Sequence, residues 1–144
     1  MSNTLYDQDF YAWANEQAAL LRAGKLDSAD IENIAEEIES MGRSEKRELV
    51  NRLAVLLLHL LKWRYQPAYR GTSWRASIEE QRLRLDRHLR DNPSLKAQLA
   101  VVMDDAYRLA RVGAERQTGL ARATFPLVCP FAFDEAMSEE FWPE

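Results

Sequence analysis

The feature that most constrains the fold is a run of nine residues, Leu53–Leu61, in which only His59 is polar. The run lies inside a longer helical pattern from about Ser44 to Gln66, and Pro67 follows it directly. A helix that is apolar on almost all sides is usually the buried centre of a bundle. The run is also about half the ~20 residues needed to span a bilayer. We therefore expect Leu53–Leu61 to form the core of a bundle that has no membrane association.

Apolar residues before this run predict two amphipathic helices. Tyr6, Phe10, Trp13 and Gln17 recur at spacings of three and four, which predicts one helix that stops at Gly24. A second stripe, with the glutamates mostly off it, consists of Ile31, Ile34, Ala35, Ile38 and Met41. We interpret Glu36, Glu37 and Glu39 as a solvated acidic face of this second helix. The segment Gly42-Arg43-Ser44 predicts a break or kink before the core helix.

Two further helices and a tail complete the pattern. A fourth helix carries one stripe made of Trp74, Ile78, Gln81, Leu85 and His88. Asn92-Pro93 predicts the start of a last helix, which stops near Gly119. Residues 119–144 contain several prolines and are expected to be mostly irregular, with one helical turn around Asp134–Met137. The tail has five large aromatic side chains, which should pack across the bundle rather than remain in water; they are Phe125, Phe131, Phe133, Phe141 and Trp142.

Length and composition agree with a compact helical protein. The chain has 144 residues, and its five glycines and five prolines are few for a fold of strands and turns. We expect an all-α fold: a single domain over residues 1–144, built as a bundle of four to five principal helices with the tail packed across it. The lone Cys129 excludes an intramolecular disulfide framework, and the first seven residues have no secretion-signal pattern. These features predict a cytoplasmic location.

Charge is distributed unevenly along the chain. The net charge is −7 over residues 1–42, +7 over residues 43–96 and −4 over residues 97–144. Such a pattern arises when acidic and basic helices lie side by side, or when a basic surface binds an anionic partner. We favour the first interpretation because nucleic-acid-binding domains typically have a basic pI, whereas the pI here is about 5.3.

No phosphate-binding loop, dinucleotide fingerprint, nucleophile elbow or His-Glu-x-x-His motif is present, so we expect no cofactor and favour a non-enzymatic role. A metal-assisted enzyme built on His59 and His88 stays open as an alternative. However, helical di-metal sites use Glu-x-x-His pairs, and leucines (Leu56 and Leu85) occupy the positions three residues before the histidines. We therefore predict no metal ligand.

Aromatic and basic residues alternate around the junction between the third and fourth helices: Trp63, Tyr65, Tyr69 and Trp74 with Lys62, Arg64, Arg70 and Arg75. Single-strand nucleic-acid binders use such pairs to stack bases and hold phosphates. We favour a structural role, in which the aromatics close the end of the bundle and the arginines stay at its rim. Farther along the fourth helix, Arg82 could pair with Asp86.

If a binding site exists, we expect it where polar residues interrupt apolar stripes on two antiparallel helices. Its candidate residues are His59, Trp63, Trp74, Gln81, Arg82 and His88. A core role, in which these residues are hydrogen-bonded and determine helix register, is the favoured interpretation.

Several segments, taken in order, resemble one family: Tyr6-Asp7-x-Asp9-Phe10-x-x-Trp13, Ala35-Glu36-Glu37-Ile38-Glu39, Gly42-Arg43-Ser44-Glu45-Lys46-Arg47-Glu48-Leu49, His59-Leu60-Leu61-Lys62-Trp63, Gln66-Pro67, Ser73-Trp74, Gln81-Arg82, Pro93-Ser94-Leu95, Thr118-Gly119-Leu120, Phe125-Pro126 and Cys129-Pro130. This chain resembles the bacterial "domain of unknown function 29" family over nearly its whole length. The resemblance implies an all-helical bacterial domain that normally stands alone. It brings no established activity, cofactor or catalytic residue.

These observations favour a non-enzymatic protein-interaction module, bound to a protein partner or to a second copy of the chain. A nucleic-acid-associated regulatory module that uses the basic residues 43–96 is the alternative, and the enzyme built on the two histidines is the second alternative.

Overall fold

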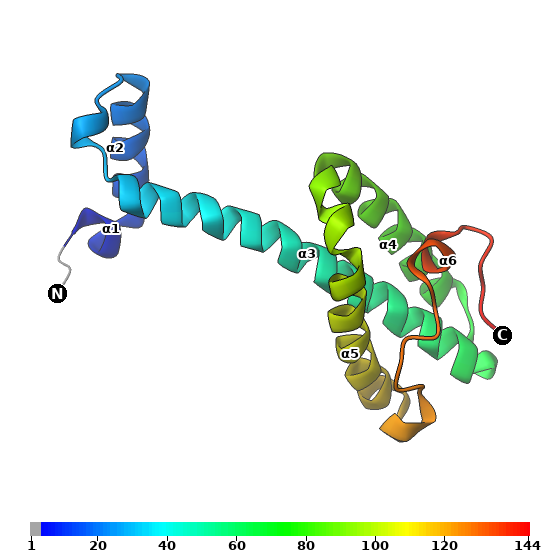
Figure 1. Cartoon of the computed structure of the whole chain (residues 1–144). Helices are drawn as coiled ribbons and strands as arrows, with labels where there is room; N and C mark the ends of the chain where they lie inside the picture. Colours follow the sequence, from blue (N-terminus) through cyan, green and yellow to red (C-terminus); the bar gives the residue numbers. More distant parts are fainter. Residues whose placement is uncertain (1–3) are drawn as a thin grey trace. The chain divides into compact units, whose positions relative to one another are not determined.

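The computed structural model describes residues 4–144; the first three residues of the N-terminal segment discussed above lie outside the described residues. All the regular secondary structure within residues 4–144 is helical, which confirms the all-α prediction (Figure 1). The α-helices are α1 (Leu5–Gln8), α2 (Phe10–Arg22), α3 (Ile31–Tyr65), α4 (Thr72–Asp91), α5 (Leu99–Thr118) and α6 (Phe133–Met137). Short 3₁₀ turns connect them: η1 (Leu26–Ser28), η2 (Pro67–Tyr69), η3 (Pro93–Gln98) and η4 (Arg122–Thr124).

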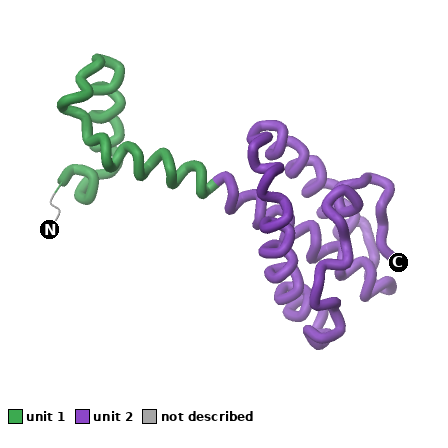
Figure 2. Tube along the Cα trace, viewed as in Figure 1, with its two compact units in different colours: residues 1–44 green, residues 45–144 purple. Residues whose placement is uncertain are grey.

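The chain divides into two compact units (Figure 2). Unit 1 extends to Ser44 and contains α1, α2, η1 and the first part of α3; unit 2 begins at Glu45 and contains the rest. The expectation of one domain stays a prediction. Among the helices of residues 4–144, none combines the length and the apolar character that a membrane crossing demands.

The first predicted helix is two helices in the structure, because Asp9 leaves the helical conformation (φ −150°, ψ 86°). Its carboxylate accepts a hydrogen bond from the backbone N–H of Ala12 at 3.0 Å and so caps the start of α2. Asp9 therefore satisfies one of the free N–H groups at the start of α2. The apolar spacing alone does not reveal that a new helix starts here.

The predicted break at Gly42-Arg43-Ser44 is wrong: α3 is continuous from Ile31 to Tyr65. One glycine inside a helix costs only about 1 kcal/mol relative to alanine, which is too little to end a helix that good helix formers flank. An ion pair between Glu36 and Arg43, at 3.1 Å, also crosses this part of the helix surface.

The core of unit 2 confirms the prediction for Leu53–Leu61. Six leucines of this run are buried: Leu53, Leu56, Leu57, Leu58, Leu60 and Leu61. Ile78 and Leu85 of α4 and Val102 and Ala106 of α5 belong to the same core cluster. The long middle helix is therefore the element around which α4 and α5 pack.

The C-terminal tail packs onto the helices of unit 2, as expected. Helix α5 ends at Thr118, and the next residue, Gly119, has a left-handed conformation (φ +76°) that suits a residue without a side chain. Beyond it, Phe125, Phe131 and Ala136 are buried in the same cluster as α3. Most of residues 119–144 is irregular, and α6 is the short helical turn predicted near Asp134–Met137.

Candidate functional site

Arg82 is a buried charged side chain in the middle of α4, only 4% exposed. Its Nε donates to the carbonyl oxygen of Ala136 and its Nη2 to that of Phe141, both at 2.8 Å. Its Nη1 is buried with no hydrogen-bond partner among the described residues. The expected pair with Asp86 is wrong, because Asp86 pairs with Arg90 at 3.1 Å. Arg82 therefore holds the tail to α4.

The indole ring of Trp142, in the tail, lies among one tryptophan and two arginines. The centroids of the Trp63 and Trp142 rings are 4.7 Å apart. The guanidinium groups of Arg82 and Arg75 lie 5.2 and 5.5 Å from the centroid of the Trp142 ring. These are cation–π distances, and such contacts strengthen where water is excluded. Trp142 therefore connects α3, α4 and the tail, although the sequence analysis did not include it among the candidate site residues.

Arg70 and Lys62 contact two of the other aromatic residues near the junction of α3 and α4, namely Trp63 and Trp74. Arg70 donates from Nε to the carbonyl oxygen of Trp63 at 2.7 Å and from Nη2 to that of Pro143 at 3.2 Å. The ammonium group of Lys62 lies 4.6 Å from the ring centroid of Trp74, and burial lowers its pKa. These contacts concern Trp63 and Trp74, whereas Tyr69 is 69% exposed, so the structural role favoured for the alternating aromatic and basic residues stays a prediction.

The two histidines bond to backbone carbonyls of α3. In half-buried His59, Nδ1 lies 2.8 Å from the carbonyl oxygen of Val55, and burial lowers the pKa of the ring. In buried His88, Nε2 lies 2.8 Å from the carbonyl oxygen of Glu45, and Nδ1 lies 3.2 Å from the carboxylate of Glu48. Within residues 4–144, no three His, Cys, Asp or Glu side chains gather as a metal ion would require.

The six candidate residues thus divide between different contacts. Trp63 and Arg82 meet at Trp142, while Trp74 contacts Lys62. Gln81 is half-buried, and its Oε1 has no hydrogen-bond partner in the described part of the chain. The stripe positions of α3 and α4 indicated that these residues are near the core, but only the tail brings two of them together.

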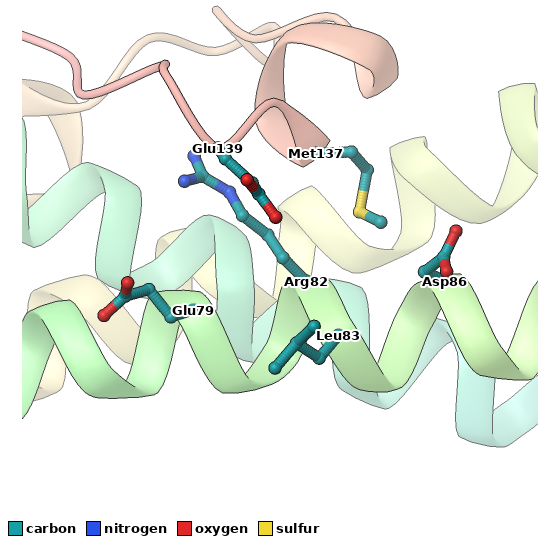
Figure 3. Close-up of a pocket in the computed structure, with 6 residues that line it drawn as sticks. All are labelled: Glu79, Arg82, Leu83, Asp86, Met137 and Glu139. Atoms are coloured by element: carbon teal, nitrogen blue, oxygen red, sulfur yellow. The ribbon is translucent and has the colours of Figure 1, made fainter.

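A cavity of about 600 Å³ lies beside Arg82, between α4 and the tail (Figure 3). Figure 3 shows the Arg82 side chain extending from α4 to the segment that carries Glu139. The lining consists of three carboxylates and two apolar side chains besides Arg82: Glu79, Asp86, Glu139, Leu83 and Met137. Burial lowers the pKa of Arg82, and the charges of Glu139 and Glu79 oppose this effect. The carboxylates therefore help to hold a buried cation next to the tail.

In unit 1, α1 is hydrogen-bonded to α3, and α2 is hydrogen-bonded to Asp30, the residue that precedes α3. The Trp13 Nε1–H donates to the carboxylate of Asp30 at 3.0 Å, and the Asn33 amide donates to the same carboxylate at 2.7 Å, which lowers the pKa of Asp30. The Tyr6 hydroxyl donates to Glu37, and this bond raises the pKa of Tyr6 to about 12. The face with Asn33 and Glu37 is therefore occupied within the unit.

A different face of α3 in unit 1 is apolar and exposed. We define the α3 stripe as Ile31, Ile38 and Met41, which are 51, 58 and 61% exposed. Ile31 and Ile38 are seven residues apart and so lie on one face, away from Asn33. Glu32 and Glu39 follow the two isoleucines and are also exposed.

The α3 stripe is part of a wider imbalance in unit 1. Within residues 4–44, Trp13 is the one large apolar side chain that is buried, whereas eight are exposed. They are Leu5, Phe10, Tyr11, Leu21, Leu26, Ile31, Ile38 and Met41. Unit 1 also carries nine acidic against three basic residues, a net charge of −6. Sequence analysis identified the apolar stripe and the acidic face of this helix, but not that the stripe is exposed.

Comparisons with known proteins place the chain in one family. The model of a family described as "Domain of unknown function DUF29" matches residues 5–142. No curated protein and no solved structure matches the chain.

Proposed function

Because the chain belongs to the DUF29 family, whose description attaches no activity to its members, we propose a function from the structure itself: a non-enzymatic protein-interaction module of the bacterial cytoplasm. The observation that carries this proposal is the exposed apolar and acidic surface of unit 1. Eight exposed large apolar side chains against one buried is an unusual ratio for a unit that has no partner.

The partner that fits this surface combines apolar and basic side chains. Each stripe residue is about half exposed, so covering it would contribute about 1 kcal/mol of apolar burial. Glu32 and Glu39 lie beside the stripe, and the net charge of −6 on unit 1 attracts a basic surface. Charge complementarity of this kind speeds association and makes it sensitive to salt.

A nucleic-acid-associated role receives less support, because most arginines of residues 43–96 have other partners. Arg70, Arg75 and Arg82 contact the tail. Four more arginines form ion pairs with carboxylates four residues away: Arg52 with Glu48, Arg84 with Glu80, Arg87 with Asp91 and Arg90 with Asp86. These pairs reduce the positive potential that phosphates would require. The enzyme built on His59 and His88 has no observation in its favour, since both rings bond to backbone carbonyls of α3.

The test compares partner capture by three forms of the tagged chain in native bacterial lysate. One form is wild type, one is Ile38→Glu in the α3 stripe, and the matched control is Val101→Glu, an equally exposed apolar position on α5 in unit 2. We expect a protein that wild type and Val101→Glu both retain, that Ile38→Glu loses, and that elutes with salt. The purified protein should then bind wild type saturably. Equal retention by Ile38→Glu, or no retained protein at all, would overturn the proposal.

A further inference from the structure

Unit 2 contains a surface whose chemistry is complementary to the α3 stripe. A cavity of about 440 Å³ lies between α5 and the segment that follows it. Its lining contains three arginines and two exposed apolar side chains, together with one aspartate and one tyrosine: Arg108, Arg111, Arg122, Val112, Leu127, Asp104 and Tyr107. We call this surface the arginine cavity. Its lining carries a net charge of +2, in contrast to the acidic unit 1.

Two of the three arginines of this cavity, Arg108 and Arg122, can exchange partners at little cost. Arg108 pairs with Asp104 at 3.1 Å and Arg122 with Glu115 at 2.9 Å, and both pairs are substantially exposed to solvent. Exposed ion pairs contribute little to stability, so replacing one carboxylate partner by another is nearly neutral. Arg111 is different, because it donates to the carbonyl oxygens of Phe125 and Arg122 and so maintains the shape of the cavity.

Apolar side chains lie beside these arginines. Leu127 is 80% exposed and lines the cavity together with Val112 of α5. Tyr107, underneath, donates its hydroxyl to the carbonyl oxygen of Pro126, and burial raises the pKa of Tyr107 to about 12. The floor of the cavity is therefore held in place, while Leu127 remains uncovered.

Resting on the function proposed above, we infer that the arginine cavity of unit 2 binds the α3 stripe of a second copy of the chain. Ile31 and Ile38 of that second copy would cover Leu127 and Val112 of the cavity. Glu32 and Glu39, beside the second copy's stripe, would face Arg108 and Arg122 of the cavity. Two stripes facing each other are a poorer match, because each unit 1 carries a net charge of −6 and would repel the other.

The contact joins two different surfaces, and so it is heterologous in character. This property separates it from a symmetric contact of stripe against stripe. A chain with a defective stripe still offers an intact cavity, and a chain with a defective cavity still offers an intact stripe. Two such variants, each unable to self-associate, should therefore associate with each other.

The test measures mass by analytical ultracentrifugation of the full chain at low and high salt. Three single variants are compared with wild type: Ile38→Glu in the stripe, Leu127→Glu in the cavity, and Val101→Glu as the control. All three positions are exposed, so the fold should persist, and circular dichroism checks that it does. We expect wild type and Val101→Glu to self-associate at low salt, and more weakly at high salt. For Ile38→Glu and for Leu127→Glu, the self-association constant should fall about tenfold or more. An equimolar mixture of Ile38→Glu and Leu127→Glu should form a mixed species.

Several outcomes would overturn the inference. One is a wild-type chain that stays monomeric at low salt; another is a Leu127→Glu chain that associates like wild type. A mixture that stays monomeric, although wild type self-associates, would also contradict it, because the intact stripe of Leu127→Glu would then fail to bind the intact cavity of Ile38→Glu. If wild type is monomeric but still captures a separate protein through Ile38, only this inference fails. If Ile38→Glu changes neither self-association nor capture, the proposed function fails with it.

Discussion

Replacing Arg82 by methionine should release the C-terminal tail and destabilise unit 2. Methionine has a similar length but cannot donate, so the carbonyl oxygens of Ala136 and Phe141 lose their 2.8 Å partners. Each hydrogen bond from a charged donor contributes about 1.5–3 kcal/mol. The cation–π contact with Trp142 adds about 1 kcal/mol.

An opposing effect reduces this loss. Wild type buries a guanidinium group whose Nη1 has no hydrogen-bond partner among residues 4–144, and removing that group recovers a desolvation cost. The recovered cost is on the order of 2 kcal/mol for one unsatisfied buried donor. We therefore expect a net loss of about 2–5 kcal/mol in the free energy of unfolding.

Urea denaturation, followed by circular dichroism and by tryptophan fluorescence, measures this difference. The matched control is Arg84→Met on the same helix, where an exposed arginine pairs with Glu80; its effect should stay within about 0.5 kcal/mol. Trypsin should also cleave Arg82→Met faster at Arg122, because the tail is less firmly attached. An Arg82→Met chain as stable as wild type would refute the reasoning, because the desolvation cost of the buried guanidinium would then equal the free energy that its hydrogen bonds and cation–π contact contribute.

Three further predictions concern the core, the glycines and pH. Leu57→Ala should lower the free energy of unfolding by about 2–5 kcal/mol in urea melts, because Leu57 is fully buried. Leu83→Ala, at an exposed position, should change the free energy of unfolding little. Equal effects of the two substitutions would contradict the assigned core. Gly42→Ala should raise the free energy of unfolding by about 0.5–1 kcal/mol in the same urea melts, since an added Cβ meets nothing within 4 Å. Gly119→Ala should lower the free energy of unfolding, because the φ of Gly119 is +76°. A destabilising Gly42→Ala would contradict the continuous helix. Burial lowers the pKa of His59 in the folded chain, so below the ordinary histidine pKa of 6.5 the unfolded chain binds more protons, and the free energy of unfolding should fall as pH decreases below 6.5. The urea midpoints of His59→Gln should therefore depend less on pH than those of wild type. An unchanged pH dependence would contradict this assignment.

Apolar periodicity predicted the main helices of the fold, because each helix of a bundle must present a face to the core. It predicted Leu53–Leu61 as the buried centre and the tail as a packed segment, and both are confirmed. It failed at Asp9, whose side chain caps a helix. The local signal of Gly42-Arg43-Ser44 failed in the opposite sense, because the cost of one glycine is too small to end α3. A single residue therefore divides a helix where its side chain caps the new start, as Asp9 does, but not where it only lowers helix propensity, as Gly42 does.

The contacts of Arg82 and Trp142 could not be predicted from the sequence, because they depend on where the tail lies. Arg82 was expected to form a local pair with Asp86, whereas its acceptors are carbonyl groups 54 and 59 residues farther along the chain. The α3 stripe illustrates another limit of the same kind. Periodicity shows that a helix has an apolar face, but it does not reveal what covers that face.

The central claim is that another protein molecule covers the α3 stripe. Photo-crosslinking tests it most directly, with benzoylphenylalanine in place of Ile38 and, as the matched control, in place of exposed Glu36 on another face of the same helix. The account predicts intermolecular adducts from position 38, identified by mass spectrometry, and few or none from position 36. Adducts that form equally from both positions, or none from position 38, would contradict it.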